Sequence, residues 1–599
     1  MENDKLETMR HSCSHLLAAA VMELWPETKL AIGPAIENGF YYDFDPSPPA
    51  GGSGQVFSDA DLPKIEAKMA EIKAKNLTFI KKEIPVEEAR KLFSDQPYKL
   101  ELIDDLAKTE GVNVSNLQGV KLNVYETGNF VDLCIGPHVE NTKDIGSFKL
   151  LSVAGAYWKG SEKNKMLTRI YGTCFPTQKE LDEYLNYLEE AKKRDHRVIG
   201  KDLNLFVFSD LVGKGLPLFT EKGSVIRREL EKFIVNEEIK RGYHHVYTSD
   251  IARVDLYKKS GHYPYYKDTM YPVMKVDDEE LILRPMTCPH HFQLFASRLR
   301  TYREMPVRYA ELAKQFRYEK SGELTGLMRV RCFCLADAHI ICRKGQAVAE
   351  INSVLDLIEF SASALGLEKD KNYRYCLSLG KRGDSKKFYQ DDEAWDFAEN
   401  VLRQVLIQRK APFFEAEGEA AFYGPKIDIQ MKNFAGVENT AFTVQYDFVM
   451  PKRFELKFIN ESGQEEEPVV IHRSSIGCIE RVMAFLIEHY AGAFPVWLSP
   501  VQVKIIPVSE KSLDYGQKVR EKLFTEEIRV ELDDRNETMQ AKIRDAEKEH
   551  VPYMLIVGPK EAEDQSVSVR IRGEKDLGKM SFEEFLRLVK EDIARKRQV

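Results

Sequence analysis

The segment YAELAKQFRYEKSGELTGLMRVRCFCLADAHIIC, residues 309–342, constrains the fold of this chain more than any other stretch. Two runs of alternating side chains flank a polar stretch that is bounded by Gly322 and Gly326. Alternation with period two is typical of β-strands, and the polar stretch between the runs indicates a connection. We therefore expect an antiparallel hairpin with a long loop.

The alternation divides the second strand into two chemically different faces. One face carries charged and large residues, namely Arg329, Arg331, Phe333, Leu335, Asp337 and His339. The opposite face carries Cys332, Cys334 and Ala336. The two cysteines allow a zinc knuckle with His339, but their opposite facing favours simple packing. Arginines, an aspartate and a histidine on one face need an anionic or metal-bound partner.

Length and composition exclude several classes of protein. A chain of 599 residues is too long for one hydrophobic core and predicts about three or four domains. No apolar run approaches the ~20 residues that a membrane span needs, and the N-terminus lacks the order of a secretory signal. Nine thinly spread cysteines indicate reduced thiols rather than a disulfide framework. We expect a cytoplasmic protein with no membrane partner.

Two spaced pairs of metal-type side chains lie outside the hairpin. His11 and His15 are four residues apart at the start of an apolar helical run, so they share a helix face. Cys134 and His138 enclose Gly136 and Pro137, which predict a loop. Three histidines and a cysteine suit a tetrahedral zinc site. A proton-transfer site and separate packing residues are the other interpretations.

The hairpin resembles motif 2 of class II aminoacyl-tRNA synthetases. Together with RPMTCPHHFQLF, AFYGPKIDIQ and the motif 3-like stretch VVIHRSSIGCIERVMAFLIEHYAGAFPVWLSPVQV, it is similar to threonyl-tRNA synthetases, and the similarity runs from near residue 1 to the C-terminus. The resemblance implies an α+β multidomain fold with a class II antiparallel-sheet catalytic core. The implied parts are an α+β editing domain (1–175), a helical linker (176–200), the catalytic domain (201–499) and an α/β anticodon-binding domain (500–599).

Cys288, His339 and His472 form a plausible three-ligand zinc set with one open position, as catalytic zinc requires. Read without the motifs, the same residues would be three core side chains. The resemblance implies one Zn²⁺ per subunit, which holds L-threonine by its amino and hydroxyl groups. It also implies that Asp337 accepts a hydrogen bond from that hydroxyl. A site built to satisfy a hydroxyl rejects valine by ~10⁴ or more.

The resemblance also assigns residues to ATP, bound with Mg²⁺. Arg317 is expected to bridge the threonine carboxylate and the α-phosphate, and Glu319 to recognise adenine. Arg329 is expected near the terminal phosphates and Arg481 at the γ-phosphate. The remaining assignments are Tyr423 and Lys426 at the amino-acid and transfer site, and Gln445 as a weaker nucleotide candidate.

The two spaced pairs match the signature of the editing domain of bacterial-type threonyl-tRNA synthetases, which is related to the alanyl editing family. Alanyl-type relatives hold zinc there, whereas threonyl versions are thought to use a water and a histidine–lysine pair. The matching residues are His11, His15, Lys99, Tyr125, Asp132, Cys134 and His138. Serine lacks only a methyl group, which a pocket discriminates by only ~10–200-fold. A second, hydrolytic site for seryl-tRNA is therefore expected.

Several positions depart from the family pattern. The N-terminal ubiquitin-like domain (TGS) of bacterial members is expected to be absent, because His11 already belongs to the editing signature. Ser249 replaces a motif 1 proline at the dimer interface. Leu335 and Phe442 replace glutamine and glycine, and we expect both to alter the pocket around the amino acid and the tRNA's terminal adenosine.

In the C-terminal hundred residues, Asn536, Glu561 and Arg570 match positions that read anticodon bases. Arg570 alternates with Arg572, so one strand face is expected to present two guanidinium groups. The implied activity is ATP-dependent charging of tRNA(Thr) with threonine by a homodimer. The alternatives are a non-catalytic, synthetase-like RNA-binding or regulatory protein and a trans-acting deacylase.

Overall fold

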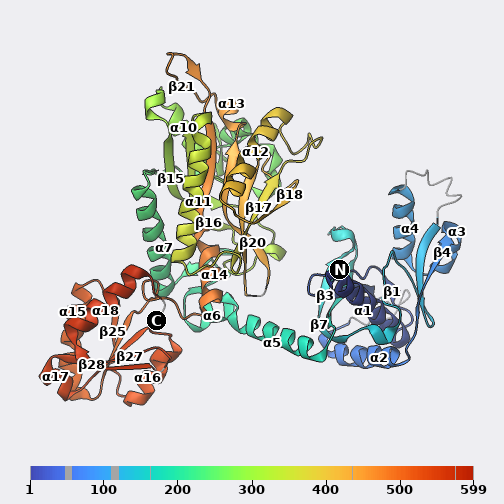
Figure 1. The fold of residues 1–599 in the computed structure, drawn as a ribbon, viewed down its shortest axis with the longest axis horizontal. Coiled ribbons are helices and arrows are strands. Elements are labelled where there is room, and N and C mark those ends of the chain that lie inside the picture. Colours follow the sequence, from blue (N-terminus) through green and yellow to red (C-terminus); the bar gives the residue numbers. More distant parts are fainter. Residues whose placement is uncertain are drawn as a thin grey trace. The chain divides into compact units, whose positions relative to one another are not determined.

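The computed structural model describes residues 2–46, 57–109, 121–161, 163–434, 436–573 and 575–597. Most of the glycine- and proline-rich insertion near residues 45–58 lies outside the described residues. The chain forms two compact units, Met1–Glu190 and Ala191–Val599 (Figure 1). Among the described residues, no helix combines the length and the apolar character that crossing a membrane requires.

The first unit combines a long N-terminal helix with two antiparallel sheets, of strand order β1-β3-β8-β7 (with β2 on β3) and β4-β5-β6. Its elements are α1 (Glu2–Leu24), β1 (Lys29–Leu30), β2 (Ala35–Ile36), β3 (Gly39–Asp45), α2 (Leu62–Ala74), β4 (Phe79–Pro85), α3 (Val86–Leu92), α4 (Pro97–Thr109), β5 (Lys121–Thr127), β6 (Phe130–Leu133), β7 (Ser147–Tyr157), β8 (Met166–Phe175) and the start of α5 (Gln178–Arg194).

Helix α1 is buried along much of its length. Cys13, Leu16, Leu17 and Ala20 recur at helical spacing, and all four are at most 1% exposed. They pack in one cluster with side chains of α2 and of strand β3. This packing prevents α1 from rotating about its axis. The helix face that carries His11 and His15 is therefore held in one position relative to the two sheets.

The second unit contains an eight-stranded sheet of order β11-β15-β16-β23-β20-β19-β17-β18, antiparallel except at its two edge pairs. The sheet strands are β11 (His244–His245), β15 (Val307–Phe316), β16 (Cys332–Cys342), β17 (Tyr373–Leu379), β18 (Phe413–Glu417), β19 (Lys426–Lys432), β20 (Glu438–Asp447) and β23 (Val469–Cys478). The helices are α6 (His196–Asp202), α7 (Glu221–Lys240), α8 (Val254–Ser260), α9 (His262–Tyr265), α10 (Cys288–Ala296), α11 (Ala347–Ala364), α12 (Asp392–Gln408), α13 (Met450–Phe454) and α14 (Ile479–Tyr490). Small strands are β9 (Phe206–Val207), β10 (Leu218–Phe219), β12 (Ile251–Arg253), β13 (Met274–Val276), β14 (Glu279–Leu283), β21 (Phe458–Ile459) and β22 (Glu465–Glu466).

The expected hairpin is confirmed as β15 and β16, which pair antiparallel from Val307↔Ile341 to Phe316↔Cys332. Side chains of one β16 face, including Cys334, Ala336 and Ala338, enter the main hydrophobic cluster. Asp337 and His339 lie on the other face. The zinc knuckle is therefore wrong for Cys334, and the packing interpretation is confirmed.

The C-terminal residues form a five-stranded sheet of order β25-β24-β26-β27-β28, with parallel pairing of β24 to β25 and β26. Its elements are β24 (Val503–Pro507), α15 (Leu513–Thr525), β25 (Val530–Leu532), α16 (Met539–Lys548), β26 (Tyr553–Val557), α17 (Pro559–Asp564), β27 (Ser566–Ile571), β28 (Lys575–Ser581) and α18 (Phe582–Arg595). Side-chain caps begin two of its helices: Thr538 accepts from Ala541 N at the start of α16, and Ser581 from Glu584 N at the start of α18. The expected α/β arrangement is confirmed.

Candidate functional site

A cavity of about 400 Å³ opens on the β16 face opposite the hydrophobic core. Ten residues singled out in the sequence line it: Cys288, Arg317, Glu319, Arg329, Leu335, Asp337, His339, Tyr423, Gln445 and His472. They come from segments that are distant in sequence, and the sheet order brings them together. Lys426 and Arg481, also assigned from the sequence, are not among the lining residues.

Cys288, His339 and His472 converge in this cavity. Their ligand atoms all lie within 4.8 Å of one another, and all three residues are buried. His339 and His472 are register partners on β16 and β23, which places their ring centroids 4.6 Å apart. Cys288 is the first residue of α10, beside Pro289. One sulfur and two imidazole nitrogens are a donor set that suits Zn²⁺.

Each imidazole of this set is held by a buried partner that the sequence analysis missed. The Nε2 of His472 donates to Asp447 Oδ2 at 2.7 Å, which leaves Nδ1 of His472 as a free lone pair. The Nδ1 of His339 lies 2.8 Å from Nδ1 of His291, whose Nε2 is 3.3 Å from Glu311 Oε2. The Glu311 carboxylate can only accept, so the proton of His291 is on Nε2 and its Nδ1 is an acceptor. Nδ1 of His339 therefore donates to Nδ1 of His291, and Nε2 of His339 keeps a free lone pair. Such partners orient metal-ligating histidines.

Burial sets the charge state of the ligand side chains. It lowers the pKa of His339 well below the ordinary value, and the neighbouring His472 and His291 add to the effect. A neutral imidazole is the form that binds a metal. Burial also raises the pKa of the Cys288 thiol, and Asp337 adds to the rise. A bound cation would offset that penalty by stabilising the thiolate.

Asp337 lines the same cavity and is 9% exposed. Gln315 Nε2 donates to Asp337 Oδ2 at 3.3 Å and to Thr287 Oγ1 at 3.1 Å, while Gln315 Oε1 is buried without a partner among the described residues. Burial raises the pKa of Asp337. The cavity therefore holds two oxygen acceptors beside the metal-type donor set, which suits a ligand with a hydroxyl or ammonium group.

The arginines sit at different places around the cavity. Arg317 follows β15, and its guanidinium stacks 5.1 Å from the Phe333 ring centre; no described residue forms an ion pair with it. Desolvation and the like charge of Arg481 lower the pKa of Arg317, against the opposing effect of Glu319. A guanidinium without a carboxylate partner at a cavity wall suits an anionic ligand.

Arg329 and Arg481 are both engaged with the protein. Arg329 pairs with Glu319 at 2.8 Å and with Glu323 at 3.4 Å. Arg481 donates to two backbone carbonyls, Met328 O at 3.2 Å and Thr440 O at 2.9 Å. The expected phosphate contact of Arg481 thus competes with one bond to the connection between β15 and β16 and with one bond to β20.

Tyr423 and Gln445 form one wall. The Tyr423 hydroxyl donates to Gln445 Oε1 at 2.7 Å, and its ring stacks on His472 at 5.0 Å. Lys426 is the register partner of Gln445, but its ammonium pairs with Asp428 at 2.7 Å. The structure therefore brings Tyr423 and Gln445 to the metal-type set, while Lys426 is paired with Asp428 and does not line the cavity.

The departures from the family pattern have different consequences. Leu335 lines the cavity, as expected. Phe442 does not: with Val444 and Tyr446 it points into the main hydrophobic cluster, fully buried. The expectation that Phe442 alters the pocket is wrong, because the alternation on β20 gives the cavity Thr443 and Gln445 instead. Ser249 is exposed, and its Oγ accepts from Ile251 N at 3.3 Å.

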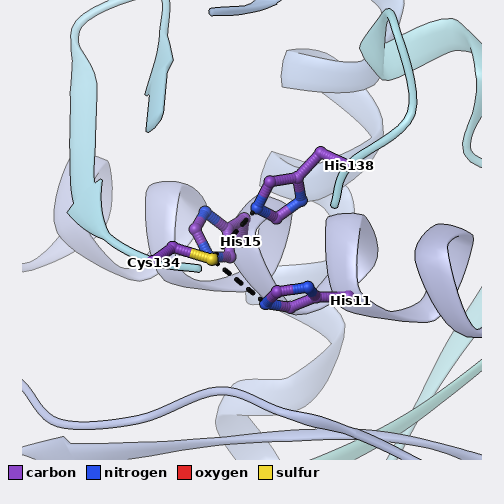
Figure 2. A group of neighbouring side chains, drawn as sticks. All are labelled: His11, His15, Cys134 and His138. Atoms are coloured by element: carbon purple, nitrogen blue, oxygen red, sulfur yellow. Dashed lines mark hydrogen bonds between the residues drawn. The ribbon is translucent and has the colours of Figure 1, made fainter. Parts of the chain in front are cut away.

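In the first unit, His11, His15, Cys134 and His138 form a second cluster, with ligand atoms within 4.8 Å of one another. Figure 2 shows the two α1 histidines facing the loop after β6. Cys134 Sγ lies 3.3 Å from Nε2 of His11 and 3.3 Å from Nε2 of His138. The predicted convergence of the two spaced pairs is confirmed.

The other expected residues of this cluster surround it. Lys99 and Asp132 form a buried ion pair, with Nζ 2.5 Å from Oδ1, and Asp132 Oδ2 lies 3.8 Å from Nε2 of His15. The Tyr125 and His138 rings are 4.4 Å apart. A Cβ at Gly136 would lie 2.2 Å from the Tyr125 hydroxyl, so only glycine allows this loop.

Burial governs the charges of this second cluster. It lowers the pKa of His11, and it lowers those of His15 and His138 well below the ordinary value, with help from the neighbouring histidines. Burial raises the pKa of Cys134 to about 12. Neutral imidazoles beside an ion-paired lysine can accept a proton from water. The same neutral set can also ligate a metal.

The anticodon candidates lie on the C-terminal sheet domain. Glu561 caps α17, where Oε2 accepts from Gly558 N at 2.9 Å and Oε1 from Ser568 Oγ at 3.0 Å. Ser568 and Arg570 share a face of β27, and Asn536 is exposed after β25. Arg572 does not present the second guanidinium that alternation predicted. Strand β27 ends at Ile571, and Arg572 donates to Phe494 O and His550 O at 3.0 and 2.9 Å.

Comparison with protein families matches three segments of the chain. Residues 271–490 match the tRNA synthetase class II core domain (G, H, P, S and T), and residues 502–592 match an anticodon binding domain. Residues 122–171 match the threonyl and alanyl tRNA synthetase second additional domain. The first match contains the cavity's zinc-type set, and the third contains Cys134 and His138.

Whole-chain relatives agree with these segments. The threonine–tRNA ligase of Geobacillus kaustophilus is 48% identical over 597 residues, covering 99% of this chain and 88% of that protein. The Streptococcus pneumoniae enzyme of the same name is 47% identical over 601 residues, covering 100% and 90%. A crystal structure of the RNA binding domain of threonyl-tRNA synthetase from Cryptosporidium parvum superposes with TM-score 0.63 at 34% identity, covering 66% of this chain and 98% of that one.

Proposed function

The chain belongs to the threonyl-tRNA synthetase family, and from that premise we propose that it charges tRNA(Thr) with L-threonine and hydrolyses mischarged seryl-tRNA(Thr). The observation that carries the charging activity is the convergence of Cys288, His339 and His472 with an unpaired Arg317 in one cavity. This arrangement offers a place for an amino acid beside a place for an anion, as amino-acid activation by ATP needs.

The metal that fits this donor set is Zn²⁺, one per subunit. Cys288, His339 and His472 would hold it, with Asp447 and His291 orienting the two imidazoles. When bound, zinc supplies a Lewis acid that takes the amino and hydroxyl groups of threonine. Valine has no hydroxyl to offer, and Asp337 would be left without its donor.

In the activation step, the threonine carboxylate attacks the α-phosphate of ATP, which is bound with Mg²⁺, and pyrophosphate leaves. Arg317 neutralises the carboxylate and the α-phosphate as they approach. Glu319 orients adenine, while Arg329 and Arg481 face the leaving phosphates; each must exchange a present intramolecular partner for the nucleotide. Tyr423 and Gln445 form the wall past which the tRNA's terminal ribose hydroxyl reaches the adenylate, and AMP leaves. Lys426, the register partner of Gln445 on the neighbouring strand, is proposed to assist this transfer.

In the editing step, a water attacks the ester of seryl-tRNA(Thr), and serine leaves the terminal ribose. The neutral imidazoles of His11, His15 and His138 are suited to accept the water's proton, and Lys99 is held by Asp132 beside them. Tyr125 and Cys134 complete the wall of the site. The proposal uses no metal here, because a neutral imidazole offers a lone pair that can take the water's proton directly.

The tRNA's anticodon is proposed to bind at Asn536, Glu561 and Arg570. The proposed boundaries are 1–175 for editing, 176–200 for the linker, 201–499 for catalysis and 500–599 for the anticodon. We also propose a cytoplasmic homodimer. The dimer is supported by an apolar side chain exposed in motif 1, where Tyr247, two residues before Ser249, is 93% exposed. Light scattering of the purified chain tests the dimer, and a monomeric mass would refute it.

Threonine-dependent exchange of pyrophosphate into ATP tests the charging proposal. Zinc-replete protein is expected to exchange with threonine and not with valine. Absence of exchange with threonine would refute it and leave the non-catalytic RNA-binding protein or the deacylase. Hydrolysis of seryl-tRNA(Thr) without exchange would identify the deacylase.

A further inference from the structure

His196 is a buried histidine outside the cavity, at the first residue of α6 and 2% exposed. Both of its ring nitrogens are engaged. Nδ1 lies 2.7 Å from Glu488 Oε1, and the backbone N–H of Leu327 donates to Nε2 at 3.1 Å. Since an N–H can only donate, Nε2 is the bare acceptor and Nδ1 carries the proton that Glu488 accepts. Neither nitrogen is left for a metal.

The bond to Leu327 reaches a tight turn in the connection between β15 and β16. Thr325 and Arg329 exchange backbone hydrogen bonds at 3.2 Å, and Met328 N donates to Thr325 O at 2.9 Å. Leu327 is fully buried in the middle of this turn. A Cβ at Gly326 would lie 2.2 Å from Nε2 of His196, so the turn closes over the ring only because this residue is glycine. The turn therefore fits His196 closely.

The same turn is held from a second side. Met328 O accepts from Arg481 Nε at 3.2 Å. Arg481 and Glu488 are both on α14 and seven residues apart, so they lie on one helix face. Helix α14 thus holds Met328 directly and Leu327 through His196. The next residue, Arg329, lines the cavity and pairs with Glu319.

We propose that His196 is a positioning residue for the nucleotide: through Leu327 it holds the turn that carries Arg329 in the form that ATP requires. The inference rests on the proposed function. Without the Nε2 acceptor, the buried Leu327 N–H has no partner, and the turn no longer keeps the conformation that positions Arg329. The apparent affinity for ATP falls with the fraction of protein that keeps the competent turn. Threonine binding is expected to be unaffected, because among the described residues no hydrogen bond joins Cys288, Asp337, His339 or His472 to the turn.

Two substitutions separate the two nitrogens of His196. An asparagine amide nitrogen takes the place of Nδ1, so His196→Asn keeps the bond to Glu488 and loses the acceptor for Leu327. A glutamine oxygen reaches the place of Nε2, so His196→Gln keeps the acceptor. His489→Asn is the matched control, since this neighbouring histidine packs on Phe485 and Tyr490 instead. Melting temperature and seryl-tRNA hydrolysis report whether each variant folds.

In the exchange assay, His196→Asn is expected to raise KM for ATP about tenfold and to leave KM for threonine within about twofold. His196→Gln restores most of the ATP affinity, and His489→Asn leaves both constants unchanged. Hydrogen exchange of the peptide around Leu327 is faster in His196→Asn than in the wild type, a readout that needs no activity. Three results would overturn the inference: an unchanged KM for ATP in His196→Asn, an equal rise in KM for ATP and for threonine, or an equal loss of ATP affinity in His196→Asn and His196→Gln. Wild-type protein without exchange would refute the proposed function instead, while the Leu327 measurement would still test the hydrogen bond.

Discussion

Asp447→Asn tests how the zinc-type site is built without removing any ligand. Asp447 is fully buried and uses both oxygens: Oδ1 accepts from Val449 N and Met450 N, each at 2.9 Å, and Oδ2 accepts from His472 at 2.7 Å. An asparagine keeps its oxygen for the two backbone N–H groups, because those groups can only donate. Its NH₂ group then faces Nε2 of His472.

That exchange reverses the hydrogen bond. Nε2 of His472 must now accept, so the ring proton moves to Nδ1, the nitrogen that is otherwise free for the metal. The substitution changes the tautomer while the shape of the site is kept. Loss of such an orienting partner costs about 10–100-fold in metal affinity, or about 1.4–2.7 kcal/mol. We expect a loss at the upper end of this range, because the amide actively holds the wrong tautomer.

The assay is an equilibrium competition for zinc between the purified protein and a chromophoric chelator, with Asp428→Asn as a matched control. Asp428 is an equally buried aspartate on the neighbouring strand β19, which pairs with Lys426 and not with a ligand histidine. Circular dichroism and melting temperature check that each variant is folded. If Asp447→Asn bound zinc as tightly as the wild type, the assigned tautomer would be wrong.

Three further predictions follow from the same geometry. Cys288→Ala is expected to abolish threonine-dependent exchange and to spare seryl-tRNA hydrolysis, while His138→Ala does the reverse; loss of both activities in both variants would contradict two separate sites. Because burial raises the pKa of Cys134 to about 12, little of its thiol is ionised at pH 8. Alkylation of Cys134, followed by mass spectrometry, should therefore be roughly a thousandfold slower than alkylation of a free cysteine. Rapid labelling of Cys134 would contradict this. Burial alone would raise the pKa of Glu311, but hydrogen bonds from His291 and Thr248 and the charge of Arg284 lower this pKa to about 2. The ionised carboxylate therefore stabilises the folded protein by a free energy on the order of 3 kcal/mol. This stabilisation is complete above about pH 5 and is lost as the pH falls towards 2. Glu311→Gln should therefore lower the melting temperature at pH 7 and lose that difference in acid, and a pH-independent difference would refute the assignment.

The sequence alone predicts the face of each strand where alternation is strict. Asp337 and His339 were assigned to one face of the second hairpin strand, and the structure places both on the cavity wall. The two histidines of α1 were likewise assigned to one helix face, and they meet Cys134 and His138. In each case the local backbone geometry decides which side chains share a face. Side chains alternate along a strand and recur every three to four residues along a helix, whatever surrounds the element.

Partners across strands and helices were not predictable in the same way. That Asp447 meets His472 depends on the register between β20 and β23, which pairs Gln445 with His472 and which no single segment encodes. A spacing signal existed for His291, since it lies one helical turn after Cys288 and shares its face. Arg572 shows the converse error, because alternation was extended one residue beyond the end of the strand.

Zinc content of freshly purified, unchelated protein tests the central claim most directly. Elemental analysis is expected to find one zinc per chain in the wild type and none above background in Cys288→Ala, with the His138→Ala variant unchanged at one. Wild-type protein without stoichiometric zinc, or a Cys288→Ala variant that retains it, would contradict the account.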